Sequence, residues 1–270
     1  MVESRHDARA YPPLSAPQPV HYELRGAAAV VTIDRPERRN AVDGPTAEAL
    51  QAAYERWLGD SEADVLVLTG AGDIAFCAGA DLKALETLGP RLEDPAGPLG
   101  FTRLTPPRPT IAAVSGWCLA GGLELALWCD LRIVTSDARL GFPERRFGVP
   151  LIDGGTQRLP RIVGQGRALD LILTGRIVPA DEALAMGMVT EVVAPGRHLD
   201  RALEYAEALA RFPQETMLAD RRAAIEGLGM RLADGIALEA ESALPTIDVA
   251  LRGASRFAAG EGRGGEGSGV

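Results

Sequence analysis

The chain has 270 residues and a net charge of −9, so it is long enough to bury a large core, and its acidic balance argues against general nucleic-acid binding. Hydrophobic residues make up 46% and charged residues 24%, which is typical of a globular protein rather than a disordered or membrane-embedded one. Three cysteines and three histidines at irregular spacing predict neither a disulfide framework nor a metal site. The polar start without an apolar signal segment predicts a cytoplasmic location.

The first part of the chain predicts a flexible arm followed by strands and helices. Residues 1–19 contain four prolines and no apolar periodicity, which indicates the arm. The apolar runs that predict strands are 20–23, 27–33, 65–69 and 131–135. A helix is expected to open at Gly44, and residues 76–82 are expected to turn from a strand tip into another helix.

Residues 111–130 run from an apolar strand through glycines into an apolar helix that carries one acid, Glu124. Gly121 and Gly122 let the backbone approach a ligand, and the free amides at a helix start attract a negatively charged oxygen. Glu124 lies about one helical turn further on, so its carboxylate returns towards the same region. This arrangement predicts catalysis if a second donor and a second acid or base lie nearby.

Strands separated by helices predict an α/β domain with right-handed crossovers. The proline- and glycine-rich stretch 89–109 predicts a loop, with at most one short helix, that covers a site. From about residue 156 the pattern becomes mainly helical, with a break at Phe212 and Pro213. The expected organisation is an arm (1–19), a core (20–195), a C-terminal helical region (196–253) and a disordered glycine-rich tail (254–270).

Four motifs, in this order and spacing, resemble the signatures of the crotonase family, also called the enoyl-CoA hydratase/isomerase superfamily. They occupy residues 76–83, 116–124, 142–144 and 154–159. The resemblance extends from about residue 20 to 255. It implies a spiral of ββα units followed by a helical region that assembles trimers, which are often paired into hexamers.

The resemblance also implies an acyl-CoA thioester as ligand. The amides of Ala80 and Gly121 fall at the positions of the oxyanion hole around the thioester carbonyl oxygen. Glu124 and Glu144 fall at the two acid–base positions of the hydratases. The implied reaction is reversible hydration of a trans-2-enoyl-CoA to a 3-hydroxyacyl-CoA without a further cofactor. Glu124 acts as general base on water, and Glu144 supplies a proton to the α-carbon.

Five residues match positions that contact the coenzyme in relatives. Arg38 and Arg39 fall near the CoA phosphates and pantetheine, and Lys83 falls near the adenine pocket. Ala78 and Asp81 fall on the loop that contacts adenine through its backbone. The alternatives are that the basic residues are ordinary surface charges and that Asp81 caps a helix.

Several alternatives remain open from the sequence. Glu124 could pair with Arg132 or Arg158 in a purely structural role, and Arg145 and Arg146, which depart from the family's pattern, could pair with Glu144. Double-bond isomerisation of an enoyl-CoA needs only one acid or base, and a noncatalytic acyl-CoA binding protein would need neither. Other reactions on the same oxyanion platform, such as hydrolysis or decarboxylation, are also compatible with the motifs. The length of the acyl chain is not specified.

Overall fold

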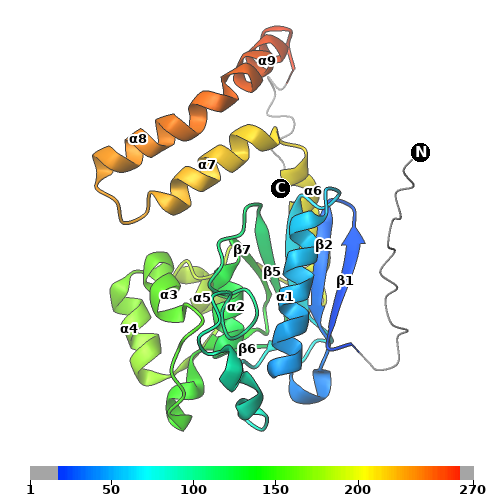
Figure 1. The fold of residues 1–270 in the computed structure, drawn as a ribbon, viewed down its shortest axis with the longest axis vertical. Helices are drawn as coiled ribbons and strands as arrows, with labels where there is room; N and C mark the ends of the chain where they lie inside the picture. Colours follow the sequence, from blue (N-terminus) through cyan, green and yellow to red (C-terminus); the bar gives the residue numbers. More distant parts are fainter. Residues whose placement is uncertain (1–17, 262–270) are drawn as a thin grey trace, which may run out of the picture.

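Two β-sheets organise residues 18–261, the part of the chain that the computed structural model describes (Figure 1). The expected arm lies outside these residues except at its end. The strands of the larger sheet are, in spatial order, β1 (Val20–Arg25), β2 (Ala28–Ile33), β3 (Val65–Gly70), β5 (Thr110–Val114), β7 (Leu131–Thr135) and β10 (Glu191–Val193). Only β1 is antiparallel to its neighbour, and the remaining pairs are parallel.

The smaller sheet contains β4 (Ala75–Cys77), β6 (Trp117–Leu119), β8 (Arg139–Gly141) and β9 (Ile177–Pro179), in that order. Consecutive strands divide between the sheets: β3, β5 and β7 enter the larger sheet, and β4, β6 and β8, which follow them, enter the smaller one. A helical segment follows each pair. This repeat confirms the expected spiral of ββα units.

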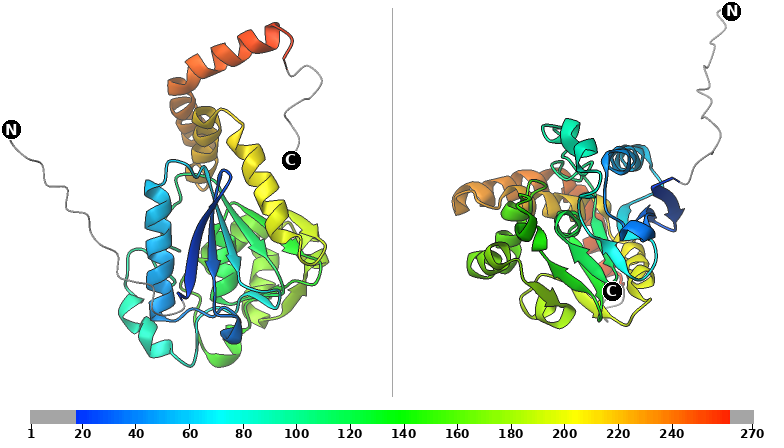
Figure 2. Two further views of the ribbon diagram at one scale, coloured as in Figure 1. Left: turned by 90° about the vertical axis from the view of Figure 1, so that its right-hand side faces the viewer. Right: turned by 90° about the horizontal axis from the view of Figure 1, so that it is seen from below.

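Both faces of the larger sheet are buried, which explains why its strands read as continuous apolar runs. On one face, alternate residues of β2 and β3 pack towards α1 (Gly44–Gly59), α2 (Gly121–Trp128) and the smaller sheet. On the other face, residues such as Val30 and Val67 pack against Ala202 and Ala206 of α6 (His198–Ala210). Figure 2 shows α1 and α6 on opposite sides of the sheet.

Local sequence explains where α1 begins and which face it buries. The Asp43 side chain accepts a hydrogen bond from the Thr46 amide (2.9 Å), and a proline stands in the first turn, where its missing N–H costs nothing. Leu50, Tyr54 and Trp57 recur at helical spacing and are buried.

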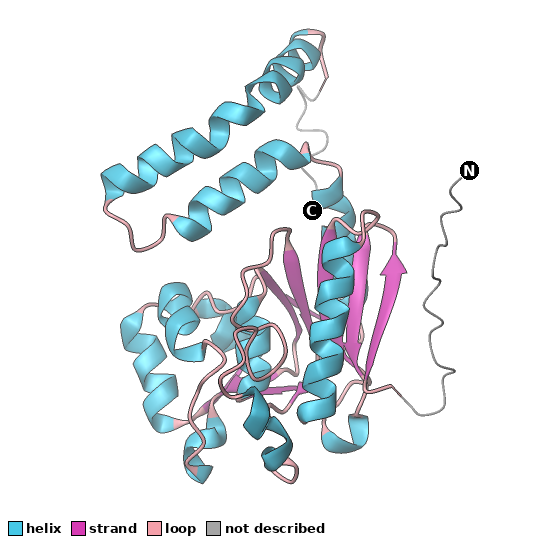
Figure 3. Cartoon of the chain, in the orientation of Figure 1, coloured by secondary structure: helices cyan, strands magenta, loops and turns pink. Residues whose placement is uncertain are grey.

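The short 3₁₀ helices are spread along the chain, whereas the remaining α-helices lie after the strand repeats. They are α3 (Gly155–Val163), α4 (Gln165–Thr174), α5 (Ala180–Ala185), α7 (Gln214–Glu226), α8 (Leu232–Ala243) and α9 (Ile247–Ala258), with the short 3₁₀ helices η1 (Pro36–Arg38), η2 (Leu85–Arg91), η3 (Pro143–Phe147) and η4 (Leu244–Thr246). Helices α7 to α9 form a layer that stands off from the sheets (Figures 1 and 3). No helix of residues 18–261 is long and apolar enough to cross a membrane.

Of three expectations about where helices begin and end, one is confirmed and two need correction. The predicted break at Phe212 and Pro213 is confirmed, since α6 ends at Ala210 and α7 begins at Gln214. The disordered tail was placed too early, because α9 continues to Ala258; residues 262–270 lie outside the described chain. Asp81 is not directly followed by an α-helix, because the next helical segment is the 3₁₀ helix η2. Its carboxylate instead accepts from the Lys83 amide (3.1 Å) in a turn before η2.

Gly122 sets the distance between α2 and the smaller sheet. A Cβ atom placed on Gly122 would lie 2.1 Å from the backbone carbonyl oxygen of Cys77. A side chain cannot fit against this backbone, so any residue other than glycine would push α2 away from β4.

We therefore predict that Gly122→Ala lowers the free energy of unfolding by about 2 kcal/mol or more, because overpacking forces the backbone to move. Gly166→Ala in α4 is the matched control, since a Cβ at Gly166 meets nothing within 4 Å. Urea unfolding of both variants measures the difference. Equal stability of the two variants would contradict the packing argument.

Candidate active site

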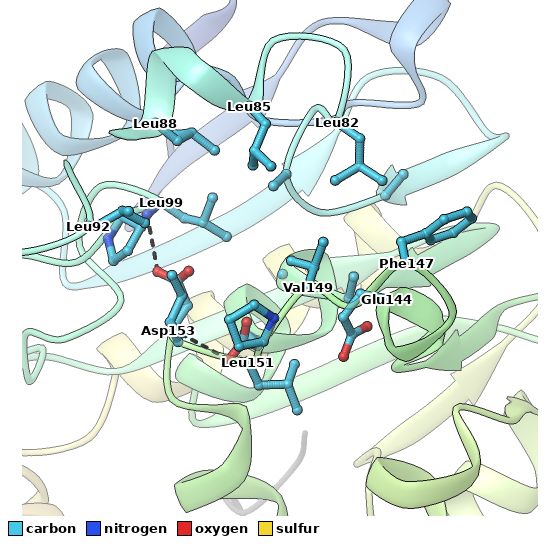
Figure 4. Close-up of a pocket in the computed structure, with 18 of the residues that line it drawn as sticks. Leu82, Leu85, Leu88, Leu92, Leu99, Glu144, Phe147, Val149, Leu151 and Asp153 are labelled. Carbon is cyan, nitrogen blue, oxygen red and sulfur yellow. Dashed lines mark hydrogen bonds between the residues drawn. The ribbon is translucent and has the colours of Figure 1, made fainter. Parts of the chain in front are cut away.

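A cavity of about 740 Å³, counted with its open mouth, lies between η2, the start of α2, η3 and the segment before α3. Figure 4 shows its leucine-rich wall and the acids that face it. The apolar lining includes Leu82, Leu85, Leu88, Leu92, Leu99, Phe147, Val149, Leu151 and Ile152. Among the described residues that line it, only Glu124, Glu144 and Asp153 are ionisable. The cavity therefore combines a hydrocarbon surface with a few polar groups, as ligand sites commonly do.

The predicted oxyanion donors, Ala80 and Gly121, both line this cavity. A Cβ placed on Gly121 would lie 3.6 Å from the Ala80 nitrogen, so the two backbone segments are neighbours. The loop of Ala80 is held by hydrogen bonds from Val42 N to Gly79 O (2.8 Å) and from Asp81 N to Val42 O (2.8 Å). Neither the Ala80 nor the Gly121 amide has a hydrogen-bond partner among residues 18–261. Two neighbouring free N–H groups suit a developing oxyanion.

Ala120 holds the start of α2 in an unusual conformation that the sequence did not reveal. Its φ of +53° and ψ of −128° lie in a region that residues with a Cβ atom rarely adopt. Its amide donates to Gly141 O (2.9 Å), which fixes this turn to β8. The strained residue lies directly before the Gly121 donor, where such outliers often mark function.

Glu124 occupies the first turn of α2 and is 2% exposed. Its Oε1 accepts hydrogen bonds from the amides of Gly155 (2.7 Å) and Asp153 (3.0 Å). Burial raises its pKa to about 8; the charge of Asp153 also raises the pKa, and the two amide hydrogen bonds oppose this shift.

The alternative that Glu124 only forms an ion pair with Arg132 or Arg158 does not match the observed contacts. Arg132 donates to backbone carbonyls, including Met188 O (2.6 Å), and Arg158 donates to Asp153 O (2.8 Å). Within the described chain, neither arginine forms an ion pair with Glu124. Gly155 is the first residue of α3, and its amide holds the Glu124 carboxylate.

Glu144 lies in η3, which begins directly after β8 because Pro143 starts the helical turn. The side chain lines the cavity, and in the described part of the protein neither buried carboxylate oxygen has a hydrogen-bond partner. Burial raises the pKa of Glu144, whereas the charge of Arg145 lowers it. Arg145 and Arg146 are exposed, and neither forms an ion pair with Glu144 between residues 18 and 261. The adjacent arginines therefore leave this acid available.

Asp153 is a third buried acid that sequence reasoning missed. Its Oδ1 accepts from Leu99 N (3.1 Å) and from the hydroxyl of Thr102. Burial raises its pKa, and the Thr102 hydrogen bond opposes the shift. The available signal was its place directly before Gly154 and Gly155 in the fourth motif.

The predicted coenzyme-binding residues meet at one edge of the cavity. The Ala78 amide donates to Arg39 O (3.0 Å), which brings the loop of Arg38 and Arg39 beside residues 78–81. Both arginines and Lys83 are exposed, and none forms an ion pair within residues 18–261. Lys83 is the only lysine of the chain. These cations are therefore free to meet phosphates.

Asp81 differs from the other predicted coenzyme residues because its side chain is already engaged. It is 6% exposed and forms an ion pair with Arg35 (3.2 Å) in addition to its bond with the Lys83 amide. Its carboxylate therefore stabilises the loop. Its amide donates to Val42 O (2.8 Å) and its carbonyl accepts from Ala84 N (3.0 Å), so only the second lone pair of that carbonyl oxygen is left for a ligand.

Fold and cavity together define an α/β-spiral protein with two free amides and buried carboxylates in one apolar site. A model of the enoyl-CoA hydratase/isomerase family matches residues 23–259. The chain therefore belongs to the enoyl-CoA hydratase/isomerase family, the crotonase family that its motifs resemble. Within the described residues, no group of three or more His, Cys, Asp or Glu side chains is arranged to hold a metal ion.

Relatives within this family are similar over most of their length. A short-chain-enoyl-CoA hydratase of Clostridium acetobutylicum is 38% identical over 224 residues, covering 82% of this chain and 86% of the relative. A crotonyl-CoA hydratase of Syntrophomonas wolfei is 37% identical over 218 residues, covering 79% and 84%. The crystal structure of enoyl-CoA hydratase EchA1 from Mycobacterium marinum superposes with a TM-score of 0.83 at 37% identity, covering 90% of this chain and 96% of that one.

The raised pKa of Glu124 predicts a stability that falls as the pH rises. Its carboxyl holds a proton more tightly in the folded state, so its contribution is present below the ordinary pKa of 4.5 and is lost as the pH approaches about 8. Glu124→Gln cannot ionise and should lose less stability across this window, by on the order of 1–3 kcal/mol.

Thermal unfolding of both proteins at matched concentration, at several pH values between about 5 and about 8, measures this difference. The variant should become progressively more stable than the wild type as the pH rises. Parallel curves would mean that burial does not raise the pKa of Glu124.

Proposed function

We propose that the protein is an enoyl-CoA hydratase that adds water reversibly to a trans-2-enoyl-CoA and gives a 3-hydroxyacyl-CoA. The observation that carries this proposal is that Glu124, Glu144 and the two free amides line the same apolar cavity. Relatives named as hydratases of short-chain enoyl-CoA and of crotonyl-CoA support it. Isomerisation would need only one acid or base, so the presence of both glutamates favours hydration.

The amides of Ala80 and Gly121 would bind the thioester carbonyl oxygen. When water adds to the β-carbon, electron density moves through the conjugated system and negative charge develops on this oxygen. Fixed N–H donors at that point stabilise the transition state by about 3 kcal/mol each. They bind the enolate more strongly than the ground-state carbonyl, which is the requirement for catalysis.

The two glutamates would perform opposite proton transfers on one water molecule and one substrate. Burial raises the pKa of Glu124 to about 8, and the two amide donors on Oε1 oppose this shift, so the ionised fraction of Glu124 would take the proton from the attacking water. Glu144 lacks such donors among the described residues, and burial favours its neutral form, so it donates the proton to the α-carbon. The same pair reverses these roles in dehydration.

The substrate class follows from the lining of the cavity. Within residues 18–261, no arginine, lysine or histidine lines the cavity, so a second carboxylate on the acyl chain would find no partner there. An uncharged hydrocarbon chain can instead bury itself against the leucines of η2 and against Phe147, which is 70% exposed. Coenzyme A would extend towards Arg38, Arg39 and Lys83, with Ala78 and the backbone of Asp81 beside its adenine. No cofactor beyond the CoA of the substrate enters this scheme.

We also propose that the protein assembles as a homotrimer, or as a homohexamer of two trimers. Helices α8 and α9 present apolar side chains that the described part of the chain leaves exposed, including Leu232, Ile236 and Leu251. Exposed apolar surface of this kind commonly marks a protein interface. A cytoplasmic location remains a prediction from the sequence.

Replacing either acid should abolish most of the hydratase activity. Glu124→Gln and Glu144→Gln are each expected to lower kcat by about 10²–10⁴-fold, because each removes a proton transfer while keeping the side-chain shape. Loss of the conjugated enoyl-thioester absorbance of crotonyl-CoA measures the rate.

Arg146→Gln is the matched control for these substitutions. Arg146 lies on η3 beside Glu144, is exposed and does not line the cavity. It should keep kcat within about twofold, since surface substitutions rarely disturb a site. Full activity of either glutamine variant would refute the two-glutamate mechanism.

The coenzyme assignment predicts a substrate-dependent effect on KM. Arg39→Gln and Lys83→Gln should each raise the KM for crotonyl-CoA about three- to tenfold, because a cation near a phosphate is lost. The KM for crotonyl-pantetheine, which lacks the nucleotide and its phosphates, should not change. An equal increase with both thioesters would place these side chains elsewhere than at the phosphates.

A further inference from the structure

Asp153 connects two parts of the cavity that are distant in sequence. It is 3% exposed, and its backbone and side chain contact different partners. The backbone amide donates to Glu124 Oε1 (3.0 Å). The side-chain Oδ1 accepts from Leu99 N (3.1 Å) and from the Thr102 hydroxyl, both more than fifty residues earlier. One residue therefore holds the acid and a part of the opposite wall.

The wall segment 97–102 lies directly over the oxyanion donors. A Cβ placed on Gly121 would lie 2.6 Å from Leu99 Cδ1, so the Leu99 side chain covers this glycine. On its other side the segment is anchored by Phe101, whose ring centroid lies 4.4 Å from that of Trp128. Gly97 and Gly100 have φ values of +106° and +110°, so the segment turns sharply at both glycines. Its position over the site depends on the aromatic anchor and on Asp153.

Arg158 closes a ring of hydrogen bonds around this contact. Its guanidinium donates to Asp153 O (2.8 Å) and to Thr102 O. Thr102 is fully buried. Its hydroxyl donates to Asp153, and its carbonyl accepts from Arg158. Satisfied buried networks of this kind hold a single geometry.

We propose that Asp153 is a positioning residue that fixes the Glu124 carboxylate and the Leu99 wall relative to each other. The proposal rests on the proposed function in so far as Glu124 is the base. A loosened wall would leave the thioester less well aligned with the oxyanion donors, and small displacements of this kind lower rates strongly.

The negative charge of Asp153 acts on the ionisation of Glu124, and this effect can be measured separately from the hydrogen bonds of Asp153 to the wall. Three charged groups face Glu124: Asp153 and Glu144 favour its protonated form, and Arg158 favours its ionised form. Arg103 and Arg158 in turn face Asp153. Asp153→Asn keeps an oxygen that can accept from Leu99 and Thr102 but removes the negative charge. It should therefore leave the wall in place and ease the ionisation of Glu124.

The test compares Asp153→Asn and Thr102→Val in the full-length protein. In Asp153→Asn, the acidic limb of kcat/KM with crotonyl-CoA should move to lower pH by about half a unit or more. Hydrogen exchange of residues 97–102 should stay close to that of the wild type. Thr102→Val keeps the volume but removes the hydroxyl, so exchange of 97–102 should accelerate about tenfold and kcat/KM should fall about tenfold.

Thr135→Val is the matched control. Thr135 is a buried threonine of β7 whose hydroxyl has no partner among the described residues, so its replacement should change neither exchange of 97–102 nor kcat/KM. An unmoved acidic limb in Asp153→Asn, or unchanged exchange and kcat/KM in Thr102→Val, would overturn the proposal. A wild-type protein that hydrates no enoyl-CoA would instead refute the proposed function, and the exchange experiment would still test the link to the wall.

Discussion

The contact between Gly122 and the Cys77 carbonyl is the constraint on which the site depends. It allows the first turn of α2 to lie directly against the end of β4. Only at this separation do the loop after β4 and the start of α2 present their free amides to one cavity. A packing requirement in the core therefore sets the geometry of a polar site at its edge.

The acids of this cavity show how one apolar environment can give different properties to similar groups. Burial raises the pKa of Glu124, Glu144 and Asp153 alike. Their hydrogen bonds differ: Glu124 receives two amide donors, Asp153 receives an amide and a hydroxyl, and no donor is found for Glu144 in the described chain. In the proposed mechanism, the backbone around each carboxylate, rather than the residue type, determines its role in proton transfer.

Features encoded by short stretches could be predicted from the sequence. The glycine pair before Glu124 predicted a helix start with free amides, and the buried apolar runs predicted the parallel strands. The missing features depend on contacts between distant segments. The bond from Gly155 to Glu124 spans 31 residues, and the bond from Leu99 to Asp153 spans 54. Local patterns carry no information about such pairs, so Asp153 read as an ordinary residue before two glycines.

The same limit explains the error after Asp81. Its position before an apolar segment suited a helix cap, but its carboxylate instead pairs with Arg35, which lies 46 residues earlier. This tertiary contact holds the loop in a turn and keeps the backbone of Ala80 facing the cavity. A local preference was overridden by an interaction that only the folded chain provides.

The single lysine of the chain has a practical consequence for chemistry in solution. Most proteins carry many lysine amines, so a reagent that acylates amines gives a mixture of products labelled at different positions. Here Lys83 offers the only such amine, and it lies exposed at the edge of the cavity. An amine-reactive fluorophore would therefore attach to one side chain, apart from the α-amino group. Its fluorescence would then report whether the cavity is occupied.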